Sequence, residues 1–169
     1  ESLLAASNLA KKIGVKTISL GDAITGEAKD VGEVMAGWAR ELILYPDANF
    51  KPPILLLSGG ECTVTVKGNG RGGRCAEFLL STALRLEALG IHNRIYGLAA
   101  DTDGIDGVSP HAGVYFDPES ISIIRSKGLD PRALLDNNDA LGVFEPLENV
   151  ITTGPTRTNV NDFRALLII

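Results

Sequence analysis

Apolar residues recur with the 3.6-residue spacing of an amphipathic helix in three parts of the chain. The first part covers residues 2–13 and stops at Gly14, and the second covers residues 27–45 and ends before Pro46. The third begins after Gly73 and closes at Gly90. The apolar positions that we expect to face a core are Leu3, Ala6, Ala10 and Ile13, then Val31, Val34, Met35, Trp38, Leu42 and Tyr45, and then Cys75, Phe78, Leu79, Thr82, Leu86 and Leu89.

Apolar or alternating runs between these helices predict strands. The continuous runs at 53–57 and 94–100 are typical of strands covered on both faces, whereas 62–67 alternates and indicates a half-exposed strand. Because helices and strands alternate along the chain, we predict an α/β fold with three layers, α/β/α, around a mixed sheet. The remaining predicted elements are strands at 15–20, 114–116, 149–153 and 163–169, and helices at 131–137 and at 118–127 with Asp117 as its cap.

The composition predicts one globular domain and argues against several classes of function. With 169 residues, 44% of them hydrophobic and 22% charged, the chain can bury a core without disulfides or metals. A net charge of −5 with no block of Lys or Arg argues against nucleic acid or an anionic membrane as a partner. The sequence has no apolar run near the ~20 residues of a membrane span, and its opening residues lack a secretory signal pattern.

The cysteines and the opening residues give two further expectations. Cys62 and Cys75 lack CxxC spacing, so we expect free, buried thiols in a protein of the reducing cytoplasm. Met35 is the only methionine, and the sequence opens at Glu1 in helical composition. We therefore expect a piece cut from a longer protein.

A glycine-rich segment precedes the third predicted helix. Gly68, Gly70, Gly72 and Gly73 are expected to allow positive φ and close approach to a ligand, while Arg71 and Arg74 add guanidinium groups suited to phosphate or carboxylate. The segment formally matches GxGxxG, but an alternating strand before it argues against a dinucleotide fingerprint, and no Gly-Lys-Ser/Thr of a Walker A loop occurs. An anion-binding loop is favoured, with a turn and helix entry as the alternative.

Two further polar loops, 101–107 and 153–162, also follow predicted strands, and such loops line the ligand crevice of open α/β sheets. Asp101, Asp103 and Asp106 could hold Mg²⁺ together with substrate phosphates, or close Asx turns. Glu61 could bind a hydroxyl or a metal, or orient Arg74. The residues that could bind a polyol or a small hydroxy acid, or simply cap their own loop, are Thr156, Asn159 and Asn161.

At these loops the chain resembles the C-terminal domain, called MOFRL, of the class II glycerate kinases, a family also known as hydroxypyruvate reductases. The matching motifs are Ser58-Gly-Gly-Glu-Cys-Thr-Val-Thr-Val66, Gly68-Asn-Gly-Arg-Gly-Gly-Arg74 with Glu77-Phe78, Thr102-Asp-Gly-Ile-Asp-Gly107, and Thr153-Gly-Pro-Thr-Arg-Thr-Asn-Val-Asn-Asp162. Residues 51–169 resemble the MOFRL domain itself, and residues 1–50 resemble the segment that joins it to the other domain. Cys75 and Arg157 depart from the family pattern, which commonly has Asn and Gly there.

The resemblance implies ATP-dependent phosphorylation of glycerate, with Mg²⁺, in a cleft between this domain and an N-terminal Rossmann-like domain. It implies that Glu61, Arg74 and Asp103 face the cleft as catalytic residues, with Asp103 also at the metal, and that Asp106, Asn159 and Asn161 are weaker candidates. The family's catalytic lysine is expected in the other domain. We therefore expect the chain alone to fold but not to turn over substrate.

Two other functions stay open at this point. NAD(P)H-dependent reduction of hydroxypyruvate is suggested by the family's second name, but the glycine motif lacks its Rossmann context. A non-catalytic module that binds a ligand and closes over another domain would use the same polar loops. A homodimer is compatible with the sequence, which does not decide the oligomeric state.

Overall fold

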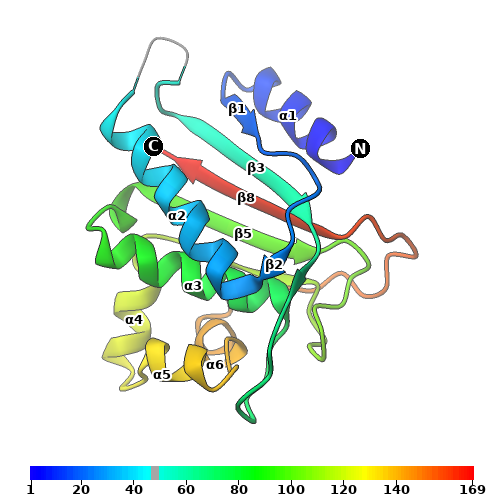
Figure 1. Cartoon of the computed structure of the whole chain (residues 1–169), viewed down its shortest axis with the longest axis vertical. Helices are drawn as coiled ribbons and strands as arrows, with labels where there is room; N and C mark the ends of the chain where they lie inside the picture. The colour runs from blue at the N-terminus through cyan, green and yellow to red at the C-terminus, as the bar shows by residue number, and fades with distance from the viewer. Residues whose placement is uncertain (47–49) are drawn as a thin grey trace.

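A mixed six-stranded sheet forms the centre of the molecule (Figure 1). The computed structural model describes residues 1–46 and 50–169. β1 pairs with β3 in parallel and every other neighbouring pair is antiparallel, so the predicted mixed sheet is confirmed. In spatial order the strands are β1 (Lys16–Ser19), β3 (Ile54–Gly60), β8 (Asp162–Ile168), β5 (Ile95–Asp101), β6 (Gly113–Phe116) and β7 (Val150–Ile151).

Helices lie on both faces of this sheet. One side chain shows how the faces differ: Thr17 of β1 contacts Ser7 of α1, with 2.6 Å between the hydroxyl oxygens, while its neighbour Ile18 packs on the main core. Since successive strand residues point to opposite faces, α1 covers one face and the core with α2 and α3 covers the other. The helices are α1 (Ser2–Lys12), α2 (Ala28–Leu44), α3 (Arg74–Ala88), α4 (Ser120–Ser126), α5 (Pro131–Asp136) and α6 (Leu141–Phe144), with 3₁₀ turns at His92–Arg94 and Glu145–Leu147.

The three predicted layers are therefore present, but they are unequal. On the core face Ile54, Leu166 and Ile168 are fully buried. On the other face α1 lies mainly against β1 and β3, and Tyr96 and Tyr115 remain 42% and 39% exposed. None of the described helices is long and apolar enough to cross a membrane.

Helix α2 buries only part of the face expected. Met35 and Leu42 are buried and Val31 packs on the core, but Val34, Trp38 and Tyr45 are 61%, 48% and 68% exposed. The reason is the close crossing of α2 on α3: a Cβ on Gly32 would lie 2.5 Å from the Phe78 carbonyl oxygen, so only small residues fit there. The face that packs on α3 is made of small residues, with Met35 and Leu42 beside them: Ala28, Gly32, Ala36 and Ala39.

The predicted strand at 62–67 is shorter in the structure. Only β4 (Cys62–Thr63) pairs, in parallel, with β2 (Gly26–Glu27). Beyond it, the Glu27 carboxylate accepts hydrogen bonds from the Thr65 amide at 3.0 Å and the Thr65 hydroxyl at 2.7 Å, which replaces a backbone ladder partner. These hydrogen bonds lower the pKa of Glu27. The first fifty residues thus supply β1, β2 and α2, while a domain boundary at residue 50 stays a prediction.

Candidate functional site

The three polar loops singled out from the sequence meet at one edge of the sheet. Asp162, the first residue of β8, lies in register between Gly60, the last residue of β3, and Asp101, the last of β5. The third loop, 153–162, reaches this edge because it leads into the start of β8, which runs antiparallel to β3 and β5. It was expected there because it follows a predicted strand. The expectation that the loops converge is therefore confirmed, for a reason that the sequence did not give.

Backbone contacts fix the second and third loops side by side. The Thr102 hydroxyl donates to the Asn161 carbonyl at 2.8 Å, and the Thr156 amide donates to the Asp103 carbonyl at 2.9 Å. A Cβ on Gly104, whose φ is +97°, would lie 2.1 Å from the Gly154 carbonyl oxygen. Glycine is thus required at position 104 both by its backbone conformation and by its neighbour.

Arg74, the first residue of α3, is the centre of a cluster of carboxylates. Its Nε lies 2.7 Å from Asp162 Oδ1, its Nη2 lies 2.6 Å from Asp101 Oδ2, and its Nη1 lies 3.1 Å from Glu61 Oε1. The side chains of Asp101 and Asp162 are only 3% and 0% exposed, whereas that of Glu61 is 57% exposed. Burial opposes the charge of Arg74, but the three carboxylates outweigh it and raise the pKa of the guanidinium.

A second arginine, Arg164, contacts the same cluster through Asp162. Arg164 is completely buried, and its Nη2 lies 2.6 Å from Asp162 Oδ2 and 3.0 Å from Cys62 Sγ. Its guanidinium carbon lies 5.1 Å from the centre of the Phe78 ring. Sequence reasoning missed both Asp162 and Arg164 as site residues. The available signal was that Arg164 shares the inward alternation of Leu166 and Ile168 in the last strand.

The glycines of the 68–73 loop pack against the chain itself. A Cβ would lie 2.2 Å from the Asn137 carbonyl oxygen at Gly68 and 2.2 Å from Asp139 Cβ at Gly70. None of the four glycines has a positive φ, so that expectation was wrong. Close packing accounts for the small size of Gly68, Gly70 and Gly73, but not of Gly72, where a Cβ would lie 3.5 Å from its nearest atom.

Hydrogen bonds hold the same loop in place. Asn138 Oδ1 accepts from the amides of Lys67 at 2.7 Å and Gly68 at 3.0 Å, and Asp139 Oδ1 accepts from the Arg71 amide at 3.0 Å. The Arg71 side chain is exposed and pairs with Glu145. The contacts present at this loop are thus those of a turn and helix entry, the alternative to an anion cradle.

Asp106 occupies the N-terminus of α3. Its carboxylate, 1% exposed, accepts hydrogen bonds from the amides of Cys75 at 3.0 Å and Ala76 at 2.9 Å. Burial raises the pKa of Asp106 to about 6, although these two hydrogen bonds act in the opposite direction. The cap that an Asn at position 75 could supply comes from Asp106 instead. Cys62 and Cys75 are both buried free thiols, as expected.

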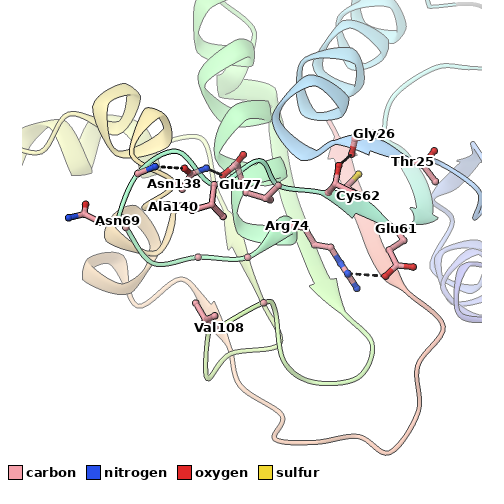
Figure 2. A pocket seen from close by; sticks show the side chains of 18 residues that line it. Thr25, Gly26, Glu61, Cys62, Asn69, Arg74, Glu77, Val108, Asn138 and Ala140 are labelled. Carbon is pink, nitrogen blue, oxygen red and sulfur yellow. Dashed lines mark hydrogen bonds and ion pairs between the residues drawn. The ribbon is translucent and has the colours of Figure 1, made fainter.

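A pocket of about 980 Å³ opens beside this cluster (Figure 2). Six predicted site residues line it: Glu61, Gly68, Gly70, Gly72, Gly73 and Arg74. The other six lie outside the lining: Arg71, Asp103, Asp106, Thr156, Asn159 and Asn161. Several further lining residues were not among the predicted site residues: Thr25, Gly26, Cys62, Val66, Glu77, Val108 and Asn138.

The contacts of the residues outside the lining are local. Asp103 Oδ1 accepts from the Ile105 amide at 2.8 Å, which closes an Asx turn, and Asn159 Oδ1 accepts from the Asn161 amide at 3.0 Å. The Thr156 hydroxyl donates to the Thr102 carbonyl. Within residues 1–46 and 50–169, no group of three His, Cys, Asp or Glu side chains could hold a metal. A metal at Asp103 stays a prediction.

The chain is similar in sequence to known proteins along nearly its whole length. It is 43% identical over 169 residues to a protein of Agrobacterium vitis that is provisionally named a hydroxypyruvate reductase. The alignment covers 99% of this chain and 43% of that protein. It is 38% identical over 164 residues to D-glycerate 2-kinase of Thermotoga maritima, with 97% of this chain and 38% of the kinase covered.

The fold agrees with these relatives. The crystal structure of glycerate kinase from Thermotoga maritima matches 97% of this chain and 39% of its own chain, with a TM-score of 0.88 and 36% identity. The chain thus spans about two fifths of the length of these relatives. The model of the MOFRL family matches residues 54–162, and the chain therefore belongs to the MOFRL family.

Proposed function

We propose that this chain is the C-terminal domain of a class II glycerate kinase and forms one wall of the cleft in which phosphate passes from ATP to glycerate. The observation that carries the proposal is Arg74, a fully charged guanidinium held by two buried carboxylates at the edge of a pocket of about 980 Å³. Glycerate kinases among the relatives support the same reaction. The remainder of the protein, with its N-terminal domain, would complete the cleft.

Arg74 can act without reorganising. Asp101 and Asp162 fix its Nε and Nη2, so the guanidinium is already oriented before a ligand arrives. Its Nη1 faces Glu61, whose side chain is exposed and held at 3.1 Å. A phosphate or carboxylate can take the place of Glu61 there, and the charge that develops during phosphoryl transfer would meet a prepared partner.

Asp103 is the residue we assign to Mg²⁺. Mg²⁺ commonly takes one or two carboxylates from the protein and the remaining ligands from phosphates and water, so a single carboxylate fits that arrangement. Oδ1 of Asp103 is used by the Ile105 amide, and Oδ2 has no hydrogen bond in the described part of the chain. When bound, the ion would neutralise phosphate charge. The same sheet edge carries Thr156, Asn159 and Asn161, which we assign to the hydroxyls of glycerate.

Reduction of hydroxypyruvate with NAD(P)H is less well supported. In a dinucleotide site the glycine loop leaves the helix N-terminus open for the pyrophosphate. Here the Asp106 carboxylate takes the first amides of α3, and the glycines pack on residues 137–139. A non-catalytic binding module would have the same pocket but would give no turnover in any assay.

Two assays of the full-length protein test the proposal: glycerate with Mg-ATP, and hydroxypyruvate with NAD(P)H. We expect phosphoglycerate only, and no turnover by the 169 residues alone above a control without protein. We expect Asp103→Ala to lower kcat/KM by an amount equivalent to about 2–4 kcal/mol through lost stabilisation of the transition state. NAD(P)H consumption without phosphoglycerate would contradict the proposal, and unchanged kinetics of the variant would remove Asp103 from the mechanism.

A further inference from the structure

Glu77 is a buried carboxylate that the mechanism above does not use. It lies one turn after Arg74 on α3, is only 3% exposed, and lines the same pocket. Its Oε2 accepts a hydrogen bond from Asn138 Nδ2 at 2.9 Å. Its Oε1 has no hydrogen bond among the described residues. This oxygen is also not one of the fully enclosed polar atoms that lack a partner, so it keeps some accessible surface. A buried acceptor therefore remains available toward the pocket.

The hydrogen bond from Asn138 holds the Glu77 carboxylate in place. Asn138 adopts a positive φ of 55°, and its Oδ1 accepts from the amides of Lys67 and Gly68. Its amide group thus connects the glycine-rich loop to Glu77, as Figure 2 shows. Burial raises the pKa of Glu77, which is consistent with an acceptor removed from bulk water.

Much of the pocket wall is apolar or made of backbone. Val64, Val66 and Ala140 line the pocket, together with the loop glycines and, on the other side of that loop, Val108 (Figure 2). Val66 and Val108 are 72% and 83% exposed, which leaves two large apolar side chains at the rim with little packing. Such a lining with few polar groups suits an uncharged organic group rather than a phosphate.

Several backbone amides of this loop and of α3 already have acceptors within the chain. The amides of Cys75 and Ala76 donate to Asp106, and those of Lys67, Gly68 and Arg71 donate to Asn138 and Asp139. Among the lining side chains Arg74 is the only cation, and it is paired with three carboxylates. A phosphate beside Glu77 would be repelled by its carboxylate, and Arg74 is the only side chain of the lining that could offset this repulsion.

We propose that the Glu77 end of the pocket binds the nucleoside part of the nucleotide, with Glu77 Oε1 accepting a hydrogen bond from a ribose hydroxyl or the base amino group. Val66 and Val108 contact the apolar faces of the nucleoside. The phosphates then extend toward Arg74. The choice of a nucleotide rests on the proposed function, whereas the preference for a neutral donor over an anion rests on the pocket alone. Glu77 is a specificity-determining residue in this arrangement.

Calorimetric titration of the full-length protein with four separate probes tests this inference: adenosine, ADP, inorganic tripolyphosphate and glycerate. Glu77→Gln keeps the size of the side chain but turns an amide donor toward the ligand. We expect it to weaken adenosine and ADP binding about tenfold and to leave tripolyphosphate and glycerate unchanged. Glu33→Gln, the same change on the exposed face of α2, is the matched control and should alter nothing.

A second variant keeps the test valid if Glu77→Gln does not fold. Val108→Asp changes a side chain that is 83% exposed, so folding is not at risk, and we expect several-fold weaker adenosine binding. Absence of adenosine binding to the wild type, or weaker glycerate binding with unchanged adenosine binding in Glu77→Gln, would overturn the inference. Adenosine binding that depends on Glu77 in a protein without glycerate phosphorylation would leave the inference standing and remove the proposed function.

Discussion

The two ends of the pocket differ in their residues: one is a cluster of ion pairs on the sheet, and the other is a glycine-rich loop with apolar side chains. At one end Arg74 and Arg164 share the Asp162 carboxylate, and both Asp162 and Asp101 are buried on strands at the centre of the sheet. At the other end the 68–73 loop lies on residues 137–140 through backbone contacts, with apolar side chains around it. The cluster of ion pairs lies at the centre of the sheet, whereas the other end, with the carboxylate of Glu77, is formed by a loop that packs on another loop.

This difference suggests different purposes. Buried ion pairs contribute little net stability, because the loss of hydration offsets their attraction. The three buried charged groups beside Arg74, namely Arg164, Asp101 and Asp162, are thus better explained as an arrangement that fixes Arg74 than as a source of stability. Gly68, Gly70 and Gly73 differ from these charged groups, because close packing of the loop against the chain already explains their small size.

Removal of the central cation should give the largest effect. Arg74→Ala leaves Asp101 and Asp162 buried with less compensation, so we expect roughly 3–5 kcal/mol lower free energy of unfolding, measured with urea and Trp38 fluorescence. In the full-length enzyme the same change should lower kcat/KM by an amount equivalent to about 2–4 kcal/mol. Arg71→Ala, at an exposed pair, is the control and should leave both quantities nearly unchanged. Equal stability of the two variants would show that the two ends do not differ in this way.

Titration of Asp106 should give the next largest effect. Its pKa is about 6 in the folded chain, against an ordinary value of 3.8, so between these pH values the native carboxyl keeps a proton that the unfolded chain has released. The free energy of unfolding should therefore fall as the pH rises from 4 to 6.5, on the order of 2–3 kcal/mol more in the wild type than in Asp106→Asn. Parallel pH profiles of the two proteins would show that Asp106 is ionised at the helix end throughout this range.

The smallest effect on stability is expected when two glycines of the same loop, Gly70 and Gly72, are each replaced by alanine. A Cβ at Gly70 would lie 2.2 Å from Asp139 Cβ, whereas a Cβ at Gly72 would have 3.5 Å to its nearest atom. Gly70→Ala should lower the free energy of unfolding by roughly 1–3 kcal/mol through overpacking, and Gly72→Ala should have little effect in the same urea experiment. A similar response of both variants would mean that the loop adapts, and that close packing does not explain its glycines.

The sequence predicted the fold better than it predicted the site. Alternation of apolar runs located most elements, because each run carries its own periodicity. It failed for α2, where small residues and not the largest ones face α3, and it missed the four residues of α6. The central place of β8 was also unpredictable, since pairing with Ile54–Gly60, more than a hundred residues earlier, leaves no local trace.

At the site, residue type and loop position predicted that Arg74 and Glu61 would lie together, and they form an ion pair. The partners that decide the chemistry come from far along the chain: Asp162 to Arg74 across 88 positions, and Asp106 to the start of α3 across 30. A glycine-rich segment looks the same in sequence whether it wraps a ligand or its own chain. Only the positions of residues 137–140 distinguish the two.

The crystal structure of the full-length protein with Mg-ADP and glycerate tests the central claim most directly. The account predicts the nucleoside between Val66 and Val108 with Glu77 within hydrogen-bonding distance, the phosphates toward Arg74, and Glu61 moved away from Nη1. Phosphates bound by the amides of the 68–73 loop, or a nucleotide that does not touch this domain, would contradict it.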